Sequence, residues 1–245
     1  MKGDVVETAM VLAAGLGTRM RPITDTLPKP LVKIAGKTLL DRGLDALADA
    51  GVNKAVVNVH HLASQIVAHV ASRERPLVTI SDESERLLDS AGGIIRALPL
   101  LGSEPFFILN ADTFWIDGER SNLHDLVLAW DERCMDILLM LADLSSATGH
   151  SGGTDFLVGS DGRLTRAKAA ANGLIYAGVA IVHPRIFAGA SDEPHSLNLY
   201  FDRAIASGRL FGHRMDGRWI TVGTPDAIAP AEAVVAETAA TASGQ

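Results

Sequence analysis

The stretch Ala9-Met10-Val11-Leu12-Ala13-Ala14-Gly15-Leu16-Gly17-Thr18-Arg19-Met20-Arg21-Pro22, followed by Leu27-Pro28-Lys29-Pro30-Leu31, decides the fold. An apolar run ends at two glycines, and the cationic side chains of Arg19, Arg21 and Lys29 follow closely. Backbone N–H groups at a glycine-rich turn after a buried strand can hold phosphate oxygens, and Arg and Lys neutralise phosphate charge. The stretch therefore predicts a nucleotide-binding loop, and its plainer alternative is a tight turn with two solvated arginines.

The composition limits the classes of protein to which the chain can belong. Its 245 residues carry 47% hydrophobic and 21% charged side chains, which is typical of a folded domain with a sizeable core. A net charge of −7 argues against general affinity for nucleic acid but allows the binding of one nucleotide. The sole cysteine, Cys134, excludes an intramolecular disulfide and a cysteine-rich zinc site. No signal peptide or membrane span is evident, so we expect a cytoplasmic protein without a membrane partner, and the oligomeric state stays open.

Apolar runs and helical repeats alternate along the first half of the chain. Strands are expected at 54–59, 77–80 and 105–109, and helices at 38–51, 62–71 and 92–98. This alternation is typical of βαβ units and a largely parallel sheet, whose ligands collect beyond the carboxyl ends of the strands. Gly15, His60 and Asp112 all fall at such ends. We therefore predict an α/β protein with a Rossmann-like, mixed but mainly parallel central sheet flanked by helices.

The second half of the chain is richer in strands. We expect strands at 136–141, 174–182, 210–215 and 219–222, a hairpin between residues 155 and 164, and a helix at 197–207. Pro225 starts a final helix. No internal repeat or long linker interrupts the chain, which predicts a single domain over residues 1–240 with a small strand-rich second lobe.

Two charged residues near the expected phosphate loop are candidates for chemistry. Lys29 lies between Pro28 and Pro30, which fix the backbone so that the charge can meet a phosphate at a defined place. A surface loop is its plainer alternative. Asp112 follows the strand at 105–109, where a carboxylate beside a phosphate site could hold Mg²⁺. For Asp112 the alternative is an Asx turn or a helix cap.

Other short motifs do not support other kinds of site. Gly15-Leu16-Gly17 matches only part of the dinucleotide fingerprint, and no Gly-Lys-Ser/Thr of a Walker loop follows. Residues 149–153 have the Gly-x-Ser-x-Gly spacing of a nucleophile elbow, but a polar loop precedes them and a strand follows, so we interpret them as a loop. His60 and His61 would point to opposite sides of a strand, and the other histidines lack ligand spacing, so no histidine metal site is expected.

Over the long signature from Leu12 to Pro22 and on through 28–31, the sequence resembles the sugar-1-phosphate nucleotidylyltransferases. The similarity continues through residues 89–93, 110–112, 176–179 and 219–225, and so covers nearly the whole chain. The short length and residues 57–60, 155–156 and 196–198 are most similar to the N-acetylmuramate-1-phosphate uridylyltransferase group of cell-wall recycling. Mannose-1-phosphate guanylyltransferases are a similar group and stand as the alternative.

The resemblance implies a fold of the nucleotide-diphospho-sugar transferase type and an Mg²⁺-dependent transfer from a nucleoside triphosphate, with UTP favoured, to a sugar 1-phosphate. The nucleotide half would span about 1–115, the sugar half about 116–225, and a carboxy-terminal helix about 225–238. Arg19 and Lys29 would be the catalytic cations. The implied nucleotide-binding residues are Leu12, Ala13, Ala14, Gly15, Gly17, Thr18, Arg19, Lys29, Asp89, Gly92 and Asn110. The implied sugar-binding residues are Asn58, Asp155, Gly178 and Asn198, and the implied metal ligand is Asp112.

The sequence departs from the family pattern at two positions. The family's Trp-x-Asp-x-Gly-Thr carries a second metal carboxylate, and Thr221 occupies that position here. Because a neutral hydroxyl is a weak ligand, the metal would be held by Asp112, phosphates and water, with lower affinity. Ala111 replaces the glycine of the family's Asn-Gly-Asp. Thr221 also supports a hypothesis from another class, a nucleotide-sugar sensor or regulatory subunit that binds without turnover.

Overall fold

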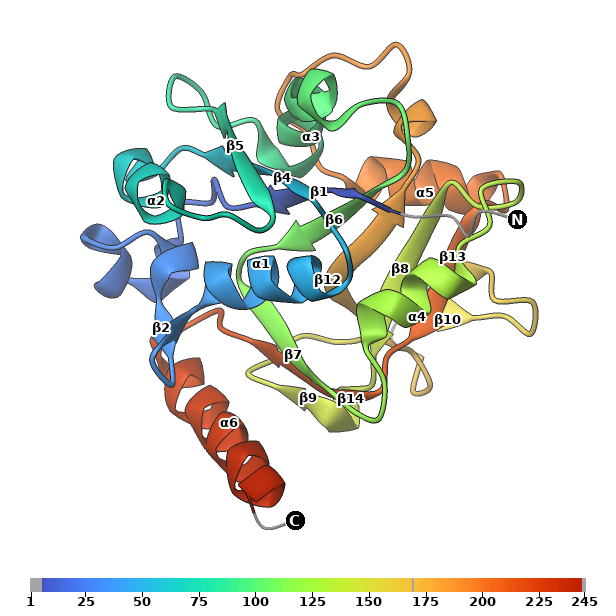
Figure 1. The fold of residues 1–245 in the computed structure, drawn as a ribbon. Helices are drawn as coiled ribbons and strands as arrows, with labels where there is room; N and C mark the ends of the chain where they lie inside the picture. Colours follow the sequence, from blue (N-terminus) through green and yellow to red (C-terminus); the bar gives the residue numbers. More distant parts are fainter. Residues whose placement is uncertain (1–5, 169, 244–245) are drawn as a thin grey trace.

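A seven-stranded sheet forms the centre of the computed structural model, which describes residues 6–168 and 170–243 (Figure 1). Its strands are β1 Thr8–Leu12, β4 Lys54–Val59, β5 Leu77–Asp82, β6 Phe106–Asn110, β8 Ile137–Ala142, β12 Ile175–Val182 and β13 Leu210–Arg214. They lie in the order β13-β8-β12-β6-β1-β4-β5. β12 runs antiparallel to both of its neighbours, and all other neighbours pair in parallel. The predicted α/β fold with a mixed, mainly parallel sheet is confirmed.

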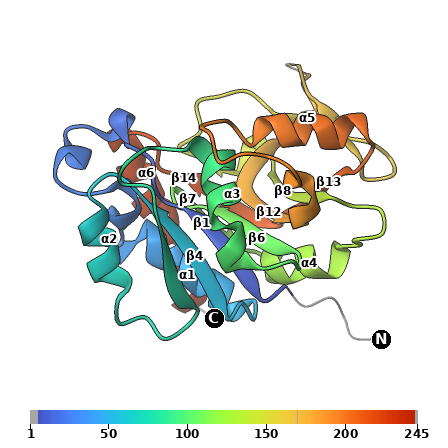
Figure 2. The same ribbon diagram turned by 90° about the horizontal axis from the view of Figure 1, so that it is seen from above.

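Helices cover both faces of this sheet (Figure 2). One face packs against α1 Leu39–Asp49, α2 Ala63–Val70 and α4 Asn122–Ala129, and the other against α3 Asp89–Leu101 and α5 Asn198–Ala206. Successive strand residues serve opposite faces, so Val11 packs with the first group of helices and Met10 with the second. A sheet buried on both sides has strands that are continuous apolar runs, which is why strands such as 54–59 could be predicted.

Helix α1 shows how the local sequence sets these elements. Thr38 caps its start by accepting a hydrogen bond from the Asp41 backbone nitrogen at 3.0 Å. Leu40, Leu44 and Leu47 recur at helical spacing and are fully buried against the sheet. Burial of each such leucine contributes about 1.5 to 3 kcal/mol. The predicted helix at 38–51 is thus confirmed as α1.

The second half adds small sheets that were expected only in part. β7 Thr113–Asp117, β14 Gly217–Thr221 and β9 Ala147–Thr148 form one sheet, and β10 Phe156–Val158 pairs with β11 Leu164–Arg166 as the expected hairpin. A fourth small pairing lies in the first half of the chain, where β2 Lys33–Ile34 pairs with β3 Lys37–Thr38. Among these, β7, β2, β3 and β9 were not predicted, nor was α4. Only Ala111 and Asp112 separate β7 from β6, which leaves little room for turn signals between the two strands.

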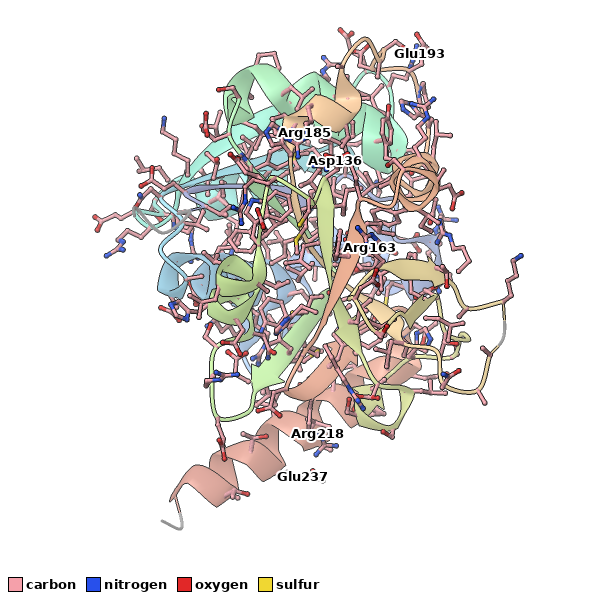
Figure 3. The ribbon with its side chains drawn as sticks, turned by 90° about the vertical axis from the view of Figure 1, so that its right-hand side faces the viewer. Asp136, Arg163, Arg185, Glu193, Arg218 and Glu237 are labelled. Atoms are coloured by element: carbon pink, nitrogen blue, oxygen red, sulfur yellow. The ribbon has the colours of Figure 1, made fainter. Side chains whose placement is uncertain are left out.

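The carboxy-terminal helix α6 (Ile228–Ser243) projects from the body of the molecule, and its first turns pack against it (Figure 1). Short 3₁₀ turns occur at η1 Thr18–Met20, η2 Ile23–Asp25, η3 Lys29–Leu31, η4 Leu144–Ser146, η5 Pro184–Phe187 and η6 Pro225–Ala227. Arg218 of β14 pairs with Glu237 of α6 at 2.9 Å (Figure 3), an exposed contact worth about 1 kcal/mol or less. Within the described residues, no helix is both long and apolar enough to cross a membrane.

A third apolar cluster joins the start of α6 to the region of the glycine loop. It is separate from the two clusters on the faces of the central sheet. Its buried members are Met20, Val32, Ile34, Leu39, Phe114, Ile220, Val222, Ala227, Ala231 and Val234. The segment that follows the glycine loop therefore packs in one apolar cluster with residues at the start of the carboxy-terminal helix.

Candidate active site

The candidate site lies where the order of the strands reverses. The chain passes from β1 through β4 and β5 and then returns to β6, on the other side of β1. Leu12 pairs with Asn110 in register, and the Ala111 nitrogen donates to the Leu12 oxygen at 3.1 Å. The loops that follow β1 and β6 therefore leave the sheet side by side. Ligands of open α/β sheets bind in the crevice at such a reversal.

The loop after β1 offers a row of unused backbone donors, and Thr18 and Arg19 belong to it. The amide nitrogens of residues 14–19 donate to no acceptor in the part of the chain that the structure describes. Gly17 sets the shape of the loop with φ +62°, and a Cβ there would lie 2.9 Å from Thr24 Cγ2. The Thr24 hydroxyl donates to the Gly17 oxygen at 2.8 Å. Free N–H groups at the end of a buried strand suit the oxygens of an anion.

Gly15 borders a cavity of about 550 Å³, which we call the first cavity. A Cβ on Gly15 would have no neighbouring heavy atom within 4 Å, so the folded chain does not itself require glycine there. The open space allows a ligand to approach the backbone closely. The candidate residues that line this cavity are Leu12, Ala13, Ala14, Gly15, Lys29, Asn58, Asp89, Asn110 and Asp112.

Lys29 and Asp112 meet in the first cavity. Lys29 Nζ lies 2.8 Å from Asp112 Oδ2, and their side chains are 12% and 36% exposed. Pro28 and Pro30 flank the lysine, which opens the 3₁₀ turn η3. The sequence left an Asx turn or a helix cap as alternative roles for Asp112. Within the described residues its side chain makes neither contact and instead bonds to Lys29. A partly buried cation and a reachable carboxylate thus stand beside the free loop amides.

Asn58 ties the glycine loop to the opposite wall of the first cavity. Its side chain is 3% exposed, its Oδ1 accepts from the Ala13 nitrogen at 2.7 Å, and its Nδ2 donates to Glu83 Oε1 at 2.7 Å. Glu83 is fully buried and also accepts from the Leu88 nitrogen at 3.1 Å, just before α3. Burial raises the pKa of the Glu83 carboxyl. Glu83 was not predicted, although its place directly after β5, beside the other strand ends, could have indicated it.

The start of α3 forms another side of the first cavity. Asp89 is exposed there with φ +59°, a backbone conformation that costs a non-glycine residue energy. Ser90 follows, and its hydroxyl oxygen accepts from the Leu197 nitrogen at 2.9 Å. Gly92 instead faces a neighbouring loop, since a Cβ there would lie 2.7 Å from the Glu193 oxygen. The structure therefore brings Asp89 to the other nucleotide candidates and leaves Gly92 outside the cavity.

A second cavity of about 240 Å³ adjoins the first, and Leu12, Ser90 and Asn110 line both. Two predicted sugar-binding residues, Asp155 and Asn198, line the second cavity. A third, Gly178, lies at an irregularity in β12 with φ +80°, and a Cβ there would be 3.2 Å from Asn110 Nδ2. Gly178 does not itself line the second cavity, and the fourth candidate, Asn58, lines the first cavity instead. The structure therefore brings Asp155 and Asn198 together in the second cavity, places Gly178 beside Asn110 at its border, and puts Asn58 in the first cavity.

Arg166 and Tyr176 also line the second cavity, and neither was predicted. Arg166 Nε donates to Asp202 Oδ1 at 2.9 Å, and its Nη2 donates to Asn198 Oδ1 at 3.0 Å. The Tyr176 hydroxyl is buried without a hydrogen-bond partner among the described residues, and burial raises its pKa. The hydroxyl therefore stays protonated at neutral pH. Arg166 could have been indicated by its place in the sequence. It is a cation at the end of the predicted hairpin, opposite Asp155 at the start of the same hairpin.

The segment after β14 returns to the glycine loop. Thr221 pairs with Thr113 in β7, and the Val222 nitrogen donates to the Asp112 oxygen at 3.1 Å. The Arg19 guanidinium lies against Gly223, where a Cβ would be 3.6 Å from Nη1. The Arg19 side chain is exposed and has no hydrogen-bond or ion-pair partner within residues 6–168 and 170–243. The structure thus places Arg19 and Thr221 at the same side of the site as Asp112.

The residues around Asp112 fit a metal ion that is held partly by substrate phosphates. In the described part of the chain, no group of three or more His, Cys, Asp or Glu side chains could hold an ion. Asp112 would supply one carboxylate, and Thr221, at the expected position of a second ligand, carries only a neutral hydroxyl. Mg²⁺ commonly takes one or two carboxylates and completes its shell with water and phosphate oxygens. This donor set suits an ion bridged by substrate rather than one held by the protein alone.

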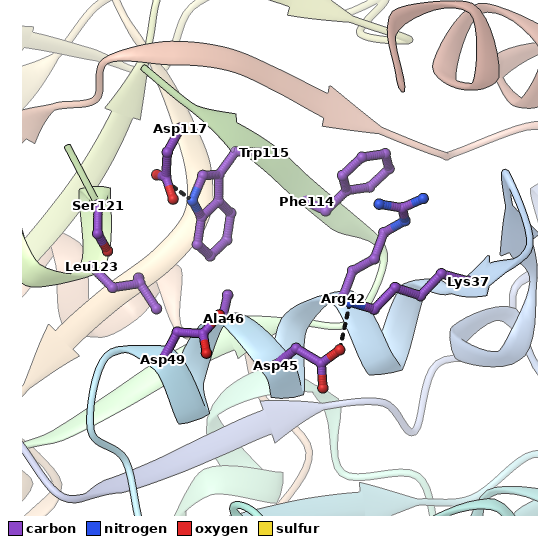
Figure 4. Close-up of a pocket in the computed structure, with 10 residues that line it drawn as sticks. All are labelled: Lys37, Arg42, Asp45, Ala46, Asp49, Phe114, Trp115, Asp117, Ser121 and Leu123. Carbon is purple, nitrogen blue, oxygen red and sulfur yellow. Dashed lines mark hydrogen bonds and ion pairs between the residues drawn. The ribbon is translucent and has the colours of Figure 1, made fainter. Parts of the chain in front are cut away.

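A separate cavity of about 360 Å³ lies between α1 and β7 (Figure 4). Its polar side chains engage one another: Lys37 pairs with Asp45, and Trp115 Nε1 donates to Asp117 Oδ1 at 3.0 Å. None of the predicted site residues lines it. It is therefore not part of the candidate active site.

Comparison with known proteins finds relatives over most of the chain. Residues 8–149 match the nucleotidyl transferase family. The chain is 45% identical over 235 residues to the N-acetylmuramate alpha-1-phosphate uridylyltransferase of Caulobacter vibrioides, which covers 94% of this chain and 97% of that protein. A protein of the same name from Neisseria meningitidis serogroup B is 33% identical over 229 residues, covering 92% and 97%.

Solved structures show the same fold. HddC from Yersinia pseudotuberculosis, complexed with GMP-PN, matches with a TM-score of 0.76 at 22% identity. The match covers 94% of this chain and 100% of that chain. At this identity the likeness concerns the fold alone, and it extends over nearly all of both molecules.

Proposed function

The chain belongs to the nucleotidyl transferase family, and from this premise we propose that it transfers a uridylyl group from UTP to N-acetylmuramate 1-phosphate. It is a sugar-1-phosphate nucleotidyltransferase. The observation that carries the proposal is the pair of cavities joined at Leu12, Ser90 and Asn110. One cavity is lined by Lys29, Asp112 and the first residues of the loop with free amides, and the lining of the other includes polar side chains suited to a sugar.

The proposed reaction is an in-line displacement at phosphorus. An oxygen of the sugar 1-phosphate attacks the α-phosphorus of UTP, the bond to the oxygen between the α- and β-phosphorus atoms breaks, and pyrophosphate leaves with that electron pair. Because little covalent chemistry is required of the protein, catalysis consists of positioning and charge neutralisation. Arg19 and Lys29 would neutralise the phosphates, and residues 12–15 would hold the base and ribose. Asp155, Gly178 and Asn198 would face the sugar.

Mg²⁺ fits this reaction, and Asp112 would hold it beside the phosphates. When bound, the ion supplies positive charge that draws phosphate oxygens together and stabilises the leaving pyrophosphate. Lys29 orients the Asp112 carboxylate through the 2.8 Å contact between Nζ and Oδ2. The free backbone donors of residues 17–19 would hold phosphate oxygens independently of the ion. A cytoplasmic location stays a prediction from the sequence.

Release of pyrophosphate tests the proposal directly. The protein is incubated with Mg²⁺, UTP and N-acetylmuramate 1-phosphate, and pyrophosphate and the uridine diphosphate sugar are measured, with omission of the sugar phosphate as the control. We expect both products in equal amounts. Preferential turnover of GTP with mannose 1-phosphate would move the assignment to guanylyl transfer. Calorimetric binding of the nucleotide-sugar without turnover of any nucleotide and sugar phosphate would favour a sensor or regulatory subunit.

A further inference from the structure

The second cavity contains a cation that the proposed function has not used. Among the residues that line this cavity, Asp155 and Arg166 carry charge. The Arg166 side chain is 30% exposed, and its Cζ lies 4.8 Å from the centre of the Phe156 ring. Its Nε donates at 2.9 Å to Oδ1 of Asp202, which does not line the cavity. Stacking and the ion pair fix the plane of the guanidinium before any ligand arrives.

The guanidinium keeps donor capacity for a ligand. Nη2 donates to Asn198 Oδ1 at 3.0 Å, and Nη1 has no partner in the part of the chain that the structure describes. A planar donor group that is already held loses little freedom when it binds one more acceptor, and a carboxylate is the acceptor that matches it best. Lys29 and Asp112 line the first cavity and not the second. The cation of the sugar cavity is therefore separate from the cation that serves the phosphates.

The acceptor named in the two relatives has two anionic ends. N-acetylmuramate 1-phosphate carries its phosphate on the anomeric carbon and an ionised carboxylate on the lactyl ether of the sugar ring. N-acetylglucosamine 1-phosphate has the same ring and phosphate but a hydroxyl in place of the ether. A sugar with two separate anionic groups matches a site with two separate cationic centres.

We propose that Arg166 binds the carboxylate of the acceptor sugar and so selects a sugar acid 1-phosphate over its neutral counterpart. The inference rests on the proposed function and names a specificity-determining residue for it. Asp155 Oδ2 accepts from the Tyr176 nitrogen at 2.8 Å, and its charge disfavours the carboxylate on its own side of the cavity. The two charged residues thus orient the sugar, because hydroxyl groups suit Asp155 and the carboxylate suits Arg166.

The test compares two acceptors in matched variants. We measure kcat/KM with UTP for N-acetylmuramate 1-phosphate and for N-acetylglucosamine 1-phosphate in the wild type, Arg166→Gln, Arg166→Lys and Arg163→Gln. Arg163 is the control because it belongs to the same hairpin, its Cζ lies 5.3 Å from the centre of the Phe211 ring, and it does not line the cavity. Thermal unfolding checks that each variant is folded.

Arg166→Gln should lower kcat/KM for the sugar acid by about 10- to 100-fold, the range expected when a charged hydrogen bond is lost, and leave the neutral sugar within about twofold. Arg166→Lys should keep part of the preference, because it keeps the charge but not the planar donor group. Arg163→Gln should change neither value. Calorimetric binding of the two uridine diphosphate sugars should reproduce the same selective loss without turnover.

The outcomes separate this inference from the function on which it rests. A wild type that turns over neither acceptor would contradict the proposed function and the inference with it. An active wild type whose preference for the sugar acid persists in Arg166→Gln would overturn only the role of Arg166. An equal loss for both acceptors in a folded Arg166→Gln would also overturn it, since it would show a general role in the site.

Discussion

The Lys29 side chain is largely buried and is held in one position. Its side chain is 12% exposed, and its Nζ lies 2.8 Å from Asp112 Oδ2. A lysine side chain is long and flexible, so its ammonium group usually occupies many positions. Here the prolines on both sides restrict the backbone that carries it. A fixed charge stabilises developing negative charge without first having to reorganise.

We therefore expect Lys29→Ala to lower kcat by about 100- to 1,000-fold, the loss typical of one preorganised electrostatic contact. The measurement is pyrophosphate release at saturating substrates. Lys33→Ala is the control, because Lys33 is exposed on β2 and should not affect the rate. A Lys29→Ala enzyme with the wild-type rate would remove Lys29 from the mechanism.

Thr221 gives a second prediction at the scale of one residue. It follows Ile220 in β14, and the next residue, Val222, hydrogen-bonds to the Asp112 backbone at 3.1 Å. A second carboxylate at this place should strengthen the binding of a divalent ion. We expect Thr221→Asp to reduce the half-saturating concentration of Mg²⁺ by about tenfold, as one added ionic ligand would.

Electron paramagnetic resonance of Mn²⁺ in the presence of UTP measures this binding without turnover. Thr224→Asp adds the same charge at an exposed position three residues further on and is the control. Equal Mn²⁺ affinity in the wild type and in Thr221→Asp would mean that position 221 does not reach the metal.

At the scale of elements, the site depends on cross-links between strand ends rather than on any one loop. Asn58 at the end of β4 bonds to Ala13 after β1 and to Glu83 after β5, and Glu83 bonds to Leu88 before α3. Three connections that are distant in sequence thus share one buried set of hydrogen bonds. Such a set fixes the walls of the first cavity relative to one another.

The buried Glu83 makes this set sensitive to pH. Burial raises its pKa above the value of 4.5 for an exposed carboxyl, so its contribution to stability is full below that value and is lost as pH rises through the folded-state pKa. The free energy of unfolding of the wild type should therefore fall relative to that of Glu83→Gln as pH rises from 4.5 towards neutrality. Urea denaturation at a series of pH values measures the difference.

Glu85→Gln, at an exposed position two residues away, is the control for the change of charge. If the difference between the wild type and Glu83→Gln stayed constant over this range, or widened in favour of the wild type, the raised pKa of Glu83 would be contradicted.

At the scale of the whole molecule, the sheet could be predicted from the sequence because its strands are buried on both faces. Residues 54–59 form a strand with those bounds, and the apolar runs at 105–109 and 174–182 also became strands. β7 and α4 were missed because both elements are short and follow β6 closely. Each contains too few apolar residues to show a clear strand or helix period. The loop from Gly15 to Lys29 was recognisable because its signature is continuous in the sequence.

The remaining residues of the site depend on tertiary contacts that no local pattern contains. Glu83 matters because it meets Asn58, which lies 25 positions earlier. Arg166 matters because α5 brings Asp202 and Asn198 to it, 36 and 32 positions later. The division of the chain into a nucleotide half and a sugar half at about residue 115 stays a prediction.

The support of the site by α6 gives a prediction for the whole molecule. Val234 is 4% exposed in the third cluster, which also buries Met20 directly after the glycine loop. We expect Val234→Ala to lower the free energy of unfolding by about 2 kcal/mol and to weaken UTP binding, although Val234 lines neither cavity. Denaturation and calorimetry measure the two effects. Ala233→Gln, on the exposed side of the helix, should change neither, and a Val234→Ala variant with unchanged UTP affinity would show that the cluster does not support the loop.

The third cluster also has a consequence for folding during synthesis of the chain. A polypeptide leaves the ribosome from its amino terminus, so the glycine loop and Lys29 emerge well before residues 228–234 have been synthesised. Until then Met20 and Phe114 lack the apolar partners that Ala231 and Val234 provide. The central sheet needs no residue beyond β13 and can assemble earlier. During translation the third cluster is thus completed only after the last strand of the central sheet has been synthesised.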